Sequence, residues 1–454
     1  MIDASAIPRV KELDGLRGIM HFAADPLAAF SQAHEKYGDL MQFTQMGRTY
    51  YMVFAPERIE TLIQTRAGFI KDYFTRDLGV VLGEGLLNAE GEPWKRNRKM
   101  MAGSFQPREI AMFAEGMVAC TDGILAGFKD GEVRDLHNES MRLTLDVVVD
   151  TLFGTKLSRF DDVEHALTEI SLEYQKLWQT WRIMLPAWVP VAPRRKIKRA
   201  RALLDEVLLE LIRQKRATPG RDLLSHLIAL SDDEGRGLSD TQLRDEAMTL
   251  FLAGHETTAL ALTYVFHLLA TDPDAYAKVV AEVDGVLAGR KPTHEDAAKL
   301  PYTSAVIREG LRLYPPAWTM ARQAATDTVA GDLQIPAGVN VIMCQYVVQR
   351  DERWFSEPNR FRPERWLGDE CKDLPRYAYY PFGGGPRVCI GQHFALLELV
   401  LVIARMTQSV SFERERGAGF KLSPVITLRP GAPVRFTIRR RSPPHTVETG
   451  RAAE

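Results

Sequence analysis

The chain has 454 residues, of which 45% are hydrophobic and 26% are charged. This balance is typical of a globular protein and excludes a disordered, collagen-like or coiled-coil chain. Its 58 lysines and arginines against 59 aspartates and glutamates leave a net charge of −1, so no overall field attracts nucleic acid or an anionic membrane. A chain of this length can enclose a large ligand without disulfides.

The cysteines indicate a reducing compartment. Cys120, Cys344, Cys371 and Cys389 lie too far apart for a zinc knuckle or a redox dithiol. The first thirty residues carry seven charged side chains, a pattern that lacks the apolar run of a signal peptide or membrane anchor. We therefore expect a cytoplasmic protein.

The N-terminal third mixes short strands with helices. Residues Leu40–Thr44 and Thr49–Phe54 predict two strands, and Pro56 opens a helix. From Trp94 to about Ala270 the apolar spacing is helical. We expect two interruptions, a proline-rich basic stretch at 186–198 and a charged loop at 231–237.

One apolar segment needs a membrane test. Within Ala247–Ala270, the longest run without His, Asp or Glu is Thr257–Phe266, and a membrane span needs about 18 such residues. Ser239 followed by Gln242 predicts a capping box, and Asp272 precedes a proline that stops the helix. The sequence predicts a helix of about 32 residues through a protein core, about 48 Å long.

The C-terminal part alternates short strands, loops and one long helix. We expect a helix ending near Leu313, a strand at Asn340–Cys344 and an irregular stretch at 350–380. A helix then runs from near Cys389 to about Arg405, and Val434–Ile438 predicts a closing strand. The composition predicts one domain over residues 1–441 and a disordered tail from 442 to 454.

The strongest local signal is the sequence FGGGPRVCIG at 382–391. Its glycines and proline prevent helix up to Arg387, so Cys389 lies in a tight loop where a helix is about to begin. Unpaired N–H groups at a helix start favour a thiolate. Such a thiolate is a nucleophile or a soft metal ligand; the alternative is a small residue buried in a turn.

The middle of the predicted long helix carries polar groups in an apolar setting. In AGHETT at 253–258, Glu256 and Thr257 are costly to bury unless they meet water, a partner or a ligand. Gly254 costs about 1 kcal/mol relative to alanine in a helix and leaves room beside the backbone. The alternative is a threonine satisfied by its own helix and a glutamate paired elsewhere.

A third pattern is Glu309-x-x-Arg312, which places both side chains on one helix face. The spacing is common by chance, because Glu210-x-x-Arg213 repeats it. Its interest comes from Arg365 in FRPERW, a second guanidinium that could close a buried network.

Taken in order, these motifs resemble the cytochrome P-450 family of haem-thiolate monooxygenases. The cysteine loop, AGHETT and the Glu309, Arg312 and Arg365 set match family patterns, and Trp94-x-x-x-Arg98 matches a pair that meets a haem propionate. One departure is Glu90, where many relatives carry a histidine.

The resemblance implies a mostly α fold with small β-sheets, in which haem b lies between the long distal helix and the cysteine loop. It implies that Cys389 is the iron ligand and that Glu256 and Thr257 deliver protons to bound dioxygen. The implied cofactor contacts are Trp94, Arg98, Ala253, Gly254, Arg322, Phe382, Gly383, Arg387, Cys389, Ile390 and Gly391.

The resemblance further implies O2 as co-substrate, a hydrophobic terpenoid, steroid or fatty-acid-like substrate, and a separate ferredoxin or flavodoxin with its reductase. We expect no nucleic acid and no membrane anchor. The candidate docking cations are Lys95, Arg96, Lys99 and Arg376, for which an ordinary solvated surface is the alternative. The candidate substrate contacts are Leu82, Leu86–Asn88, Thr249, Ala253, Ala317, Trp318, Thr319 and the aromatic stretch 178–188.

Two rival functions use the same cysteine. A haem sensor or electron carrier needs Cys389 but gains nothing from Glu256 and Thr257. A thiol hydrolase could pair Cys389 with His393, four residues on, but leaves Trp94 and Arg98 unexplained.

Overall fold

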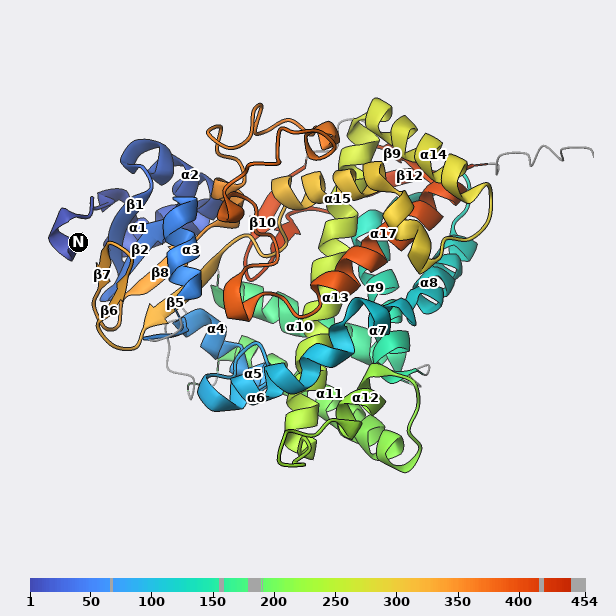
Figure 1. Ribbon diagram of the computed structural model, residues 1–454, viewed down its shortest axis with the longest axis horizontal. Helices are drawn as coiled ribbons and strands as arrows, with labels where there is room; N and C mark the ends of the chain where they lie inside the picture. The colour runs from blue at the N-terminus through green and yellow to red at the C-terminus, as the bar shows by residue number, and fades with distance from the viewer. Residues whose placement is uncertain (66–67, 155–158, 179–188, 190, 416–419, 442–454) are drawn as a thin grey trace, which may run out of the picture.

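The computed structural model describes residues 1–454 except 66–67, 155–158, 179–188, 190, 416–419 and 442–454. Helices make up most of the described chain, and the largest sheet lies at one end of the molecule, on the left in Figure 1. This arrangement matches the predicted fold class, mostly α with small sheets.

The large sheet collects strands from both ends of the chain, in the order β1–β2–β8–β5–β3. Strand β2 pairs antiparallel with β1 and parallel with β8. The turn between β1 and β2 places Met46 and Gly47 at φ 51° and 71°, which is the twist that a two-residue hairpin turn needs. The sheet strands are β1 (Leu40–Gln45), β2 (Arg48–Val53), β3 (Phe69–Lys71), β5 (Met320–Ala324) and β8 (Asn340–Met343).

The long helix α13, Asp240–Thr271, runs through the helical part of the molecule (Figure 1). Ser239 and Gln242 form the predicted capping box, and Asp272 is the C-cap. Phe251 in its first half belongs to one apolar cluster and Val265 in its second half to another. The predicted core helix is therefore confirmed at both ends, and α13 joins two parts of the core.

The first three helices lie beside the sheets at one end of the molecule, and most of the others lie around α13 (Figure 1). They are α1 (Gly15–Ala24), α2 (Pro26–Tyr37), α3 (Pro56–Gln64), α4 (Tyr73–Asp77), α5 (Gly79–Leu82), α6 (Gly91–Met101), α7 (Pro107–Ala111), α8 (Ala114–Gly127), α9 (Leu136–Phe153), α10 (Phe160–Trp178), α11 (Ala192–Ala217), α12 (Leu223–Ala229), α14 (Pro273–Leu287), α15 (Pro301–Leu313), α16 (Gln345–Val348) and α17 (Gln392–Ser409).

Smaller sheets complete the described chain. A three-stranded sheet has the order β4–β12–β9, and the pairs β6–β7 and β10–β11 form hairpins. Their strands are β4 (Val133–Asp135), β6 (Thr328–Ala330), β7 (Leu333–Ile335), β9 (Val410–Arg414), β10 (Leu422–Pro424), β11 (Leu428–Pro430) and β12 (Arg435–Arg440).

Two predicted boundaries differ from the structure. Of the stretch 186–198 expected to interrupt the helices, residues 192–198 lie on α11, which begins at Ala192, because Pro193 occupies the first turn, where proline is tolerated; residues 186–188 and 190 lie outside the described residues. Helix α17 begins at Gln392, three residues after Cys389, and continues to Ser409. The predicted tail from 442 lies outside the described residues.

One described segment, Pro107–Gly127, is long and apolar enough to span a membrane by composition, with a mean hydropathy of 1.4. Its buried side chains, among them Met117 and Leu125, belong to the same apolar cluster as α17 residues. The segment comprises α7 and α8, and 39% of its most apolar 18-residue window is buried in the protein.

Candidate active site

The cysteine loop is a closed turn that glycines hold against neighbouring elements. The Cys389 N–H donates to the Phe382 carbonyl over 3.0 Å. Gly385 has φ +60°, and a Cβ there would lie 2.7 Å from the Ile63 side chain of α3. A Cβ on Gly384 would lie 2.4 Å from the Tyr377 ring. The glycines predicted from FGGG therefore permit the close approach that fixes the cysteine.

The Cys389 side chain is accessible yet lies among surrounding protein atoms. Burial raises the pKa of the thiol, while the Gly391 N–H and the Arg98 charge lower it in part. A helix start alone therefore does not produce a free thiolate here, contrary to our expectation from the sequence. A cysteine binds a metal ion as the thiolate, so metal binding and loss of the thiol proton are coupled. A bound metal ion would therefore compensate the negative charge that burial disfavours.

The middle of α13 is open, although most of that helix is buried. Ala253 is exposed, and Gly254, Glu256 and Thr257 are partly exposed. The Thr257 hydroxyl donates to the Ala253 carbonyl over 2.7 Å, which leaves its oxygen lone pairs as acceptors. This stretch therefore exposes a small side chain and a hydroxyl in the middle of an otherwise buried helix, as a helix segment that faces a ligand would.

Gly254 is partly exposed, and the side-chain position that it leaves vacant points toward a neighbouring helix. A Cβ at this residue would contact only Val148 of α9, at 3.5 Å, which is an ordinary contact distance. The vacant side of the glycine therefore faces α9, and the exposed neighbour Ala253 is the residue that borders the open space.

Glu256 is already paired. Its carboxylate accepts from Arg429 Nε over 2.8 Å and from the Thr427 hydroxyl over 2.5 Å, and the Ser171 hydroxyl donates to it over 3.3 Å. Burial raises the pKa of Glu256, but the Arg429 charge and the Thr427 hydrogen bond outweigh it, so the pKa lies below its usual value. The structure thus shows the alternative in which Glu256 is paired with other residues. Through these contacts Glu256 links α13 to α10 and to the β10–β11 hairpin.

Arg387 and Trp94 meet beside the cysteine loop. The Arg387 guanidinium lies 3.9 Å from the centre of the Trp94 ring and donates to the Ala89 carbonyl over 2.7 Å. It also forms an ion pair with Glu90, whose carboxylate accepts from the Lys71 backbone N–H over 2.7 Å. Glu90, the departure from the family pattern, therefore holds Arg387 in place.

Positive charge exceeds negative charge around this point. Burial and the charges of Arg322 and Arg387 lower the pKa of Lys71 to about 8. Burial also lowers the pKa of Arg322 and of Arg98, and in the described part of the chain Arg322 Nε has no hydrogen-bond partner. Four cations against the two carboxylates of Glu90 and Asp72 fit an anionic group such as a pair of propionates.

Lys71 is the residue that sequence reasoning missed. Nothing in its local sequence marks it, because β3 is three residues long and the pairing Lys71↔Arg322 with β5 forms across a sequence distance of about 250 residues. A single lysine before a helix N-cap does not predict a member of a distant cation cluster.

Glu309, Arg312 and Arg365 come together as expected. Arg312 donates to both Glu309 oxygens over 2.9 and 2.8 Å, and Arg365 Nε donates over 3.1 Å. All three side chains have zero exposure. The Trp366 indole N–H adds a bond of 2.9 Å to Glu309, so the carboxylate is fully satisfied.

The candidate substrate contacts divide into two groups. Ala317 is exposed and Thr319 is half-buried. Trp318, by contrast, is 3% exposed, and its indole donates to the Val425 carbonyl over 3.0 Å, so it belongs to the core. Thr249 is 6% exposed and bonds its own helix through the Asp245 carbonyl. Most of the aromatic stretch 178–188 lies outside the described residues.

The candidate docking cations all have acidic neighbours. Lys95 pairs with Glu92, Arg96 with Asp232 and Lys99 with Asp233, at 2.6, 2.7 and 2.5 Å. Arg376 lies 4.0 Å from Glu60. Arg96 also donates to the Arg236 and Gly237 carbonyls, so it anchors the 231–237 loop.

A thiol-hydrolase dyad is not formed. Among the described residues no hydrogen bond joins Cys389 to His393, and His393 is exposed. A nucleophilic cysteine needs a base within hydrogen-bond reach.

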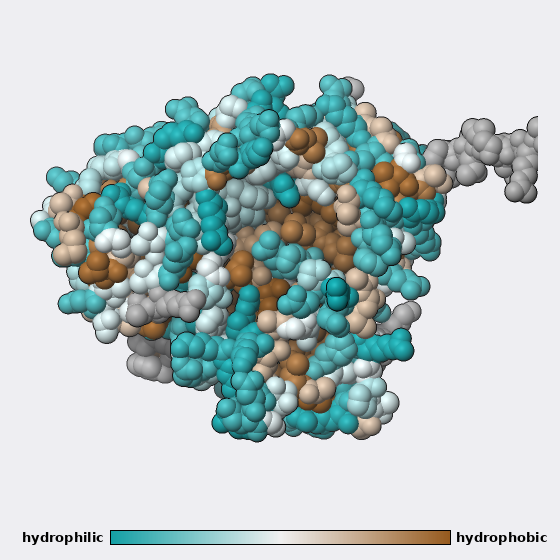
Figure 2. Space-filling model, in the orientation of Figure 1, coloured by the Kyte–Doolittle hydropathy of each residue, from teal (hydrophilic) through white to brown (hydrophobic). Residues whose placement is uncertain are grey.

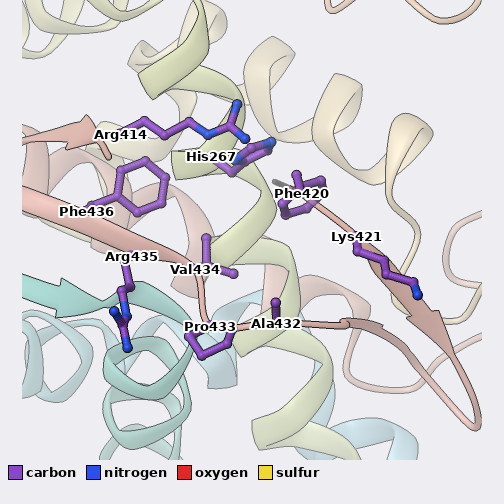
Figure 3. A pocket seen from close by; sticks show the side chains of 9 residues that line it. All are labelled: His267, Arg414, Phe420, Lys421, Ala432, Pro433, Val434, Arg435 and Phe436. Carbon is purple, nitrogen blue, oxygen red and sulfur yellow. The ribbon is translucent and has the colours of Figure 1, made fainter. Parts of the chain in front are cut away.

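The surface carries an apolar hollow near the middle of the face shown in Figure 2, framed by hydrophilic side chains. A separate recess lies at the far end of α13, where His267 stacks on Phe420 with ring centres 3.8 Å apart (Figure 3). Its volume is about 10 Å³, room for about one water molecule, so it is no substrate site.

Known proteins share both this sequence pattern and this fold. The cytochrome P-450 family profile matches residues 16–431. A cyclooctat-9-en-7-ol 5-monooxygenase from Streptomyces melanosporofaciens is 34% identical, with 81% of each chain covered. A pentalenene oxygenase from Streptomyces avermitilis is 30% identical over 83% of this chain and 85% of its own. The crystal structure of the cytochrome P450DA heme domain superposes with a TM-score of 0.86, at 25% identity, over 98% and 99% of the two chains.

Proposed function

Because this chain belongs to the cytochrome P-450 family and is a monooxygenase of that family, we propose that it inserts one oxygen atom of O2 into an apolar, terpenoid-type molecule. The observation that carries the proposal is the open stretch of α13, where exposed Ala253 and the Thr257 hydroxyl interrupt an otherwise buried helix. Two similar proteins are named for oxidising cyclooctat-9-en-7-ol and pentalenene, which supports an apolar substrate.

In this proposal the Cys389 sulfur holds the iron of haem b, and the cation cluster binds the propionates. A bound haem supplies activation of dioxygen, which thiolate ligation favours by donating electron density. The Phe382 carbonyl accepts from the Cys389 N–H, and the Gly391 N–H bonds the sulfur. With Gly383 and Ile390 these residues would border the iron, and Arg98, Arg322 and Arg387 would neutralise the propionates together with Lys71. Trp94 keeps Arg387 in place through the ring contact already described.

Glu256 and Thr257 have distinct proton roles. Thr257 offers its oxygen as an acceptor on the open side of α13, so it positions a proton near the substrate. Glu256 lies one residue away and is held by Arg429, so it must exchange this partner for water before it carries a proton inward. The ion pair with Arg429 therefore controls when the Glu256 carboxylate is free to transfer a proton.

Electrons come from a separate ferredoxin or flavodoxin in this proposal, and the protein works in the cytoplasm. Since the candidate docking cations are paired within the chain, a donor has to compete with Asp232 and Asp233 for them.

The test is turnover under isotopically labelled O2 with a ferredoxin, its reductase and an apolar panel of terpenoids, steroids and fatty acids. We expect a substrate-dependent shift of the ferric Soret band, and one labelled oxygen atom in the product. A haem sensor or electron carrier would show no reductant consumption that depends on an added compound, and that result would refute the proposal.

A further inference from the structure

A short segment between α5 and α6 is held against α13 at one end and against the cysteine loop at the other. We call residues 83–90 the clamp segment. Its backbone carries the predicted substrate contacts Leu86–Asn88, and Ala89 and Glu90 at its far end bind Arg387. The segment therefore lies between the long helix and the cofactor contacts.

Two adjacent carboxylates of α13 capture backbone N–H groups of the clamp segment. Asp245 accepts from the Glu84 N–H over 2.9 Å, and Glu246 accepts from the Leu86 N–H over 2.8 Å. The second Glu246 oxygen accepts from Asn97 of α6 over 2.9 Å. Glu246 is fully buried, so each of its oxygens has one partner and the bonds are shielded from water.

Glycines let the segment approach α13 closely. Gly83 has φ +63°, and a Cβ there would lie 2.3 Å from an Asp245 carboxylate oxygen. A Cβ on Gly85 would lie 2.2 Å from the Thr249 hydroxyl and 2.5 Å from the Asp245 carbonyl. Thr249, which we predicted to touch substrate, instead meets this glycine.

We propose that Asp245 and Glu246 are positioning residues that fix the clamp segment as one wall of the substrate pocket and thereby set the affinity for bulky apolar ligands. They act through the backbone of residues 84 and 86 and do not touch the reacting atoms. This inference rests on the proposed function, because a pocket wall matters only where a ligand binds beside the cofactor.

The chain offers a matched control for Glu246. Glu282 of α14 likewise accepts from backbone N–H groups, those of Tyr302 and Thr303, over 2.6 and 2.8 Å, whereas Glu246 accepts from one backbone N–H and from the Asn97 amide. Helices α14 and α15 lie on the opposite side of the molecule from α5 and α6 (Figure 1). Both carboxylates therefore have the same structural task, but only Glu246 adjoins the proposed pocket.

The experiment compares two iron-binding azoles in the holoenzyme, by titration of the ferric Soret band. Imidazole is small and reports on the cofactor alone, whereas 1-phenylimidazole also contacts the pocket wall. We expect Glu246→Leu to weaken 1-phenylimidazole binding by about tenfold, the effect of losing apolar contacts in a pocket, and to change imidazole binding by less than about twofold. Glu246→Gln, which keeps one acceptor oxygen, should restore part of the loss.

Glu282→Leu should lower the unfolding temperature without changing the ratio of the two azole affinities. A second pair of variants avoids loss of charge. Gly85→Ala should repeat the effect of Glu246→Leu, whereas Gly123→Ala, whose Cβ would meet no atom within 4 Å, should have none.

Two negative results are distinguishable. If wild-type protein binds neither azole at iron, the proposed function fails. If wild-type protein binds both, and the affinity ratio stays within about threefold in Glu246→Leu and Gly85→Ala, the pocket-wall role is wrong. The same conclusion follows if Glu282→Leu changes the ratio as much as Glu246→Leu does.

Discussion

Two buried glutamate–arginine pairs of this protein differ in how completely they are enclosed. Glu309 with Arg312 and Arg365 has zero side-chain exposure, and main-chain carbonyls of Gln349 and Pro358 accept the remaining Arg312 N–H groups. Glu256 and Arg429 keep side-chain exposures of 12% and 14%, at the edge of the open stretch of α13.

The Glu309 set is fully enclosed and has many partners, so its contacts cannot be exchanged for water. The Glu256–Arg429 pair is partly exposed, so its contacts can be. Removing one partner from a fully enclosed set leaves an uncompensated charge with no access to water. A partly exposed carboxylate can exchange a guanidinium for water, so its protonation can take part in chemistry. The following predictions test whether the two sets behave as differently as their surroundings suggest.

The largest effect is expected for Glu309→Gln. This change leaves the buried Arg312 guanidinium facing a neutral group, while Arg365 keeps its ion pair with Glu370 at 2.7 Å, so the free energy of unfolding should fall by about 3–5 kcal/mol. Urea denaturation of the holoprotein measures it. Glu210→Gln is the control, since Glu210 and Arg213 share the three-residue spacing but are 54% and 69% exposed. This variant should leave the free energy of unfolding unchanged. Equal effects of both variants would contradict the comparison.

The second prediction concerns proton delivery by Glu256 and Thr257. Glu256→Gln should lower kcat by about 10²-fold, a typical loss for a proton-transfer group, and Thr257→Ala should divert reductant to hydrogen peroxide. Product and peroxide are measured for each molecule of reductant consumed. Thr258→Ala removes a buried hydroxyl that bonds Gly254 over 3.0 Å and should remain coupled. If Thr258→Ala uncouples as strongly, the assignment to Thr257 is wrong.

A smaller loss is expected for Arg429→Gln. Without Arg429, Glu256 keeps the Thr427 and Ser171 hydroxyls but its pKa rises, so it releases a proton less readily. We therefore expect kcat to fall about tenfold, within the range of one charged hydrogen bond. Steady-state turnover measures it, with the exposed Arg435→Gln as control. Wild-type turnover in Arg429→Gln would show that the ion pair has no functional role.

The smallest effect is a reversal in the pH dependence of stability. In wild type the pKa of Glu256 is lowered, so its contribution to stability is present above the unfolded value of 4.5 and is lost as pH falls below it. In Arg429→Gln the Thr427 hydrogen bond still opposes burial but the charge of Arg429 is lost, so we expect the pKa of Glu256 to rise above 4.5. Stability should then decrease as pH rises from 4.5, by at most about 1.4 kcal/mol per pH unit. Thermal unfolding from pH 4.5 to 6 measures the difference; parallel curves would contradict it.

Features fixed by nearby residues could be predicted from the sequence. The bounds of α13 follow from the capping box at Ser239 and the Asp272-Pro273 stop, since both act within one helical turn. The Cys389 loop followed from its glycines, whose φ values and close contacts leave no room for other residues. The resemblance to the cytochrome P-450 family predicted that Arg365 joins Glu309 and Arg312 in one set.

Features that depend on distant partners could not be predicted. Glu246 binds a backbone N–H that lies 160 residues away in sequence, and Glu256 binds Arg429 across 173 residues. Periodicity says that an acid on an apolar helix needs a partner, but it does not say which one. Trp318 and Thr249 are both buried, and their contact with substrate stays a prediction, because apolar or small residues near a predicted pocket look alike in sequence whether they face it or the core.

The central claim is that the Cys389 sulfur binds the haem iron, and the carbon monoxide difference spectrum of the ferrous protein tests it most directly. Thiolate ligation gives a strongly red-shifted Soret band, which we expect in wild type and which should disappear in Cys389→His. A wild-type spectrum with the band of imidazole ligation, or protein that contains no haem after expression with a haem precursor, would contradict the account.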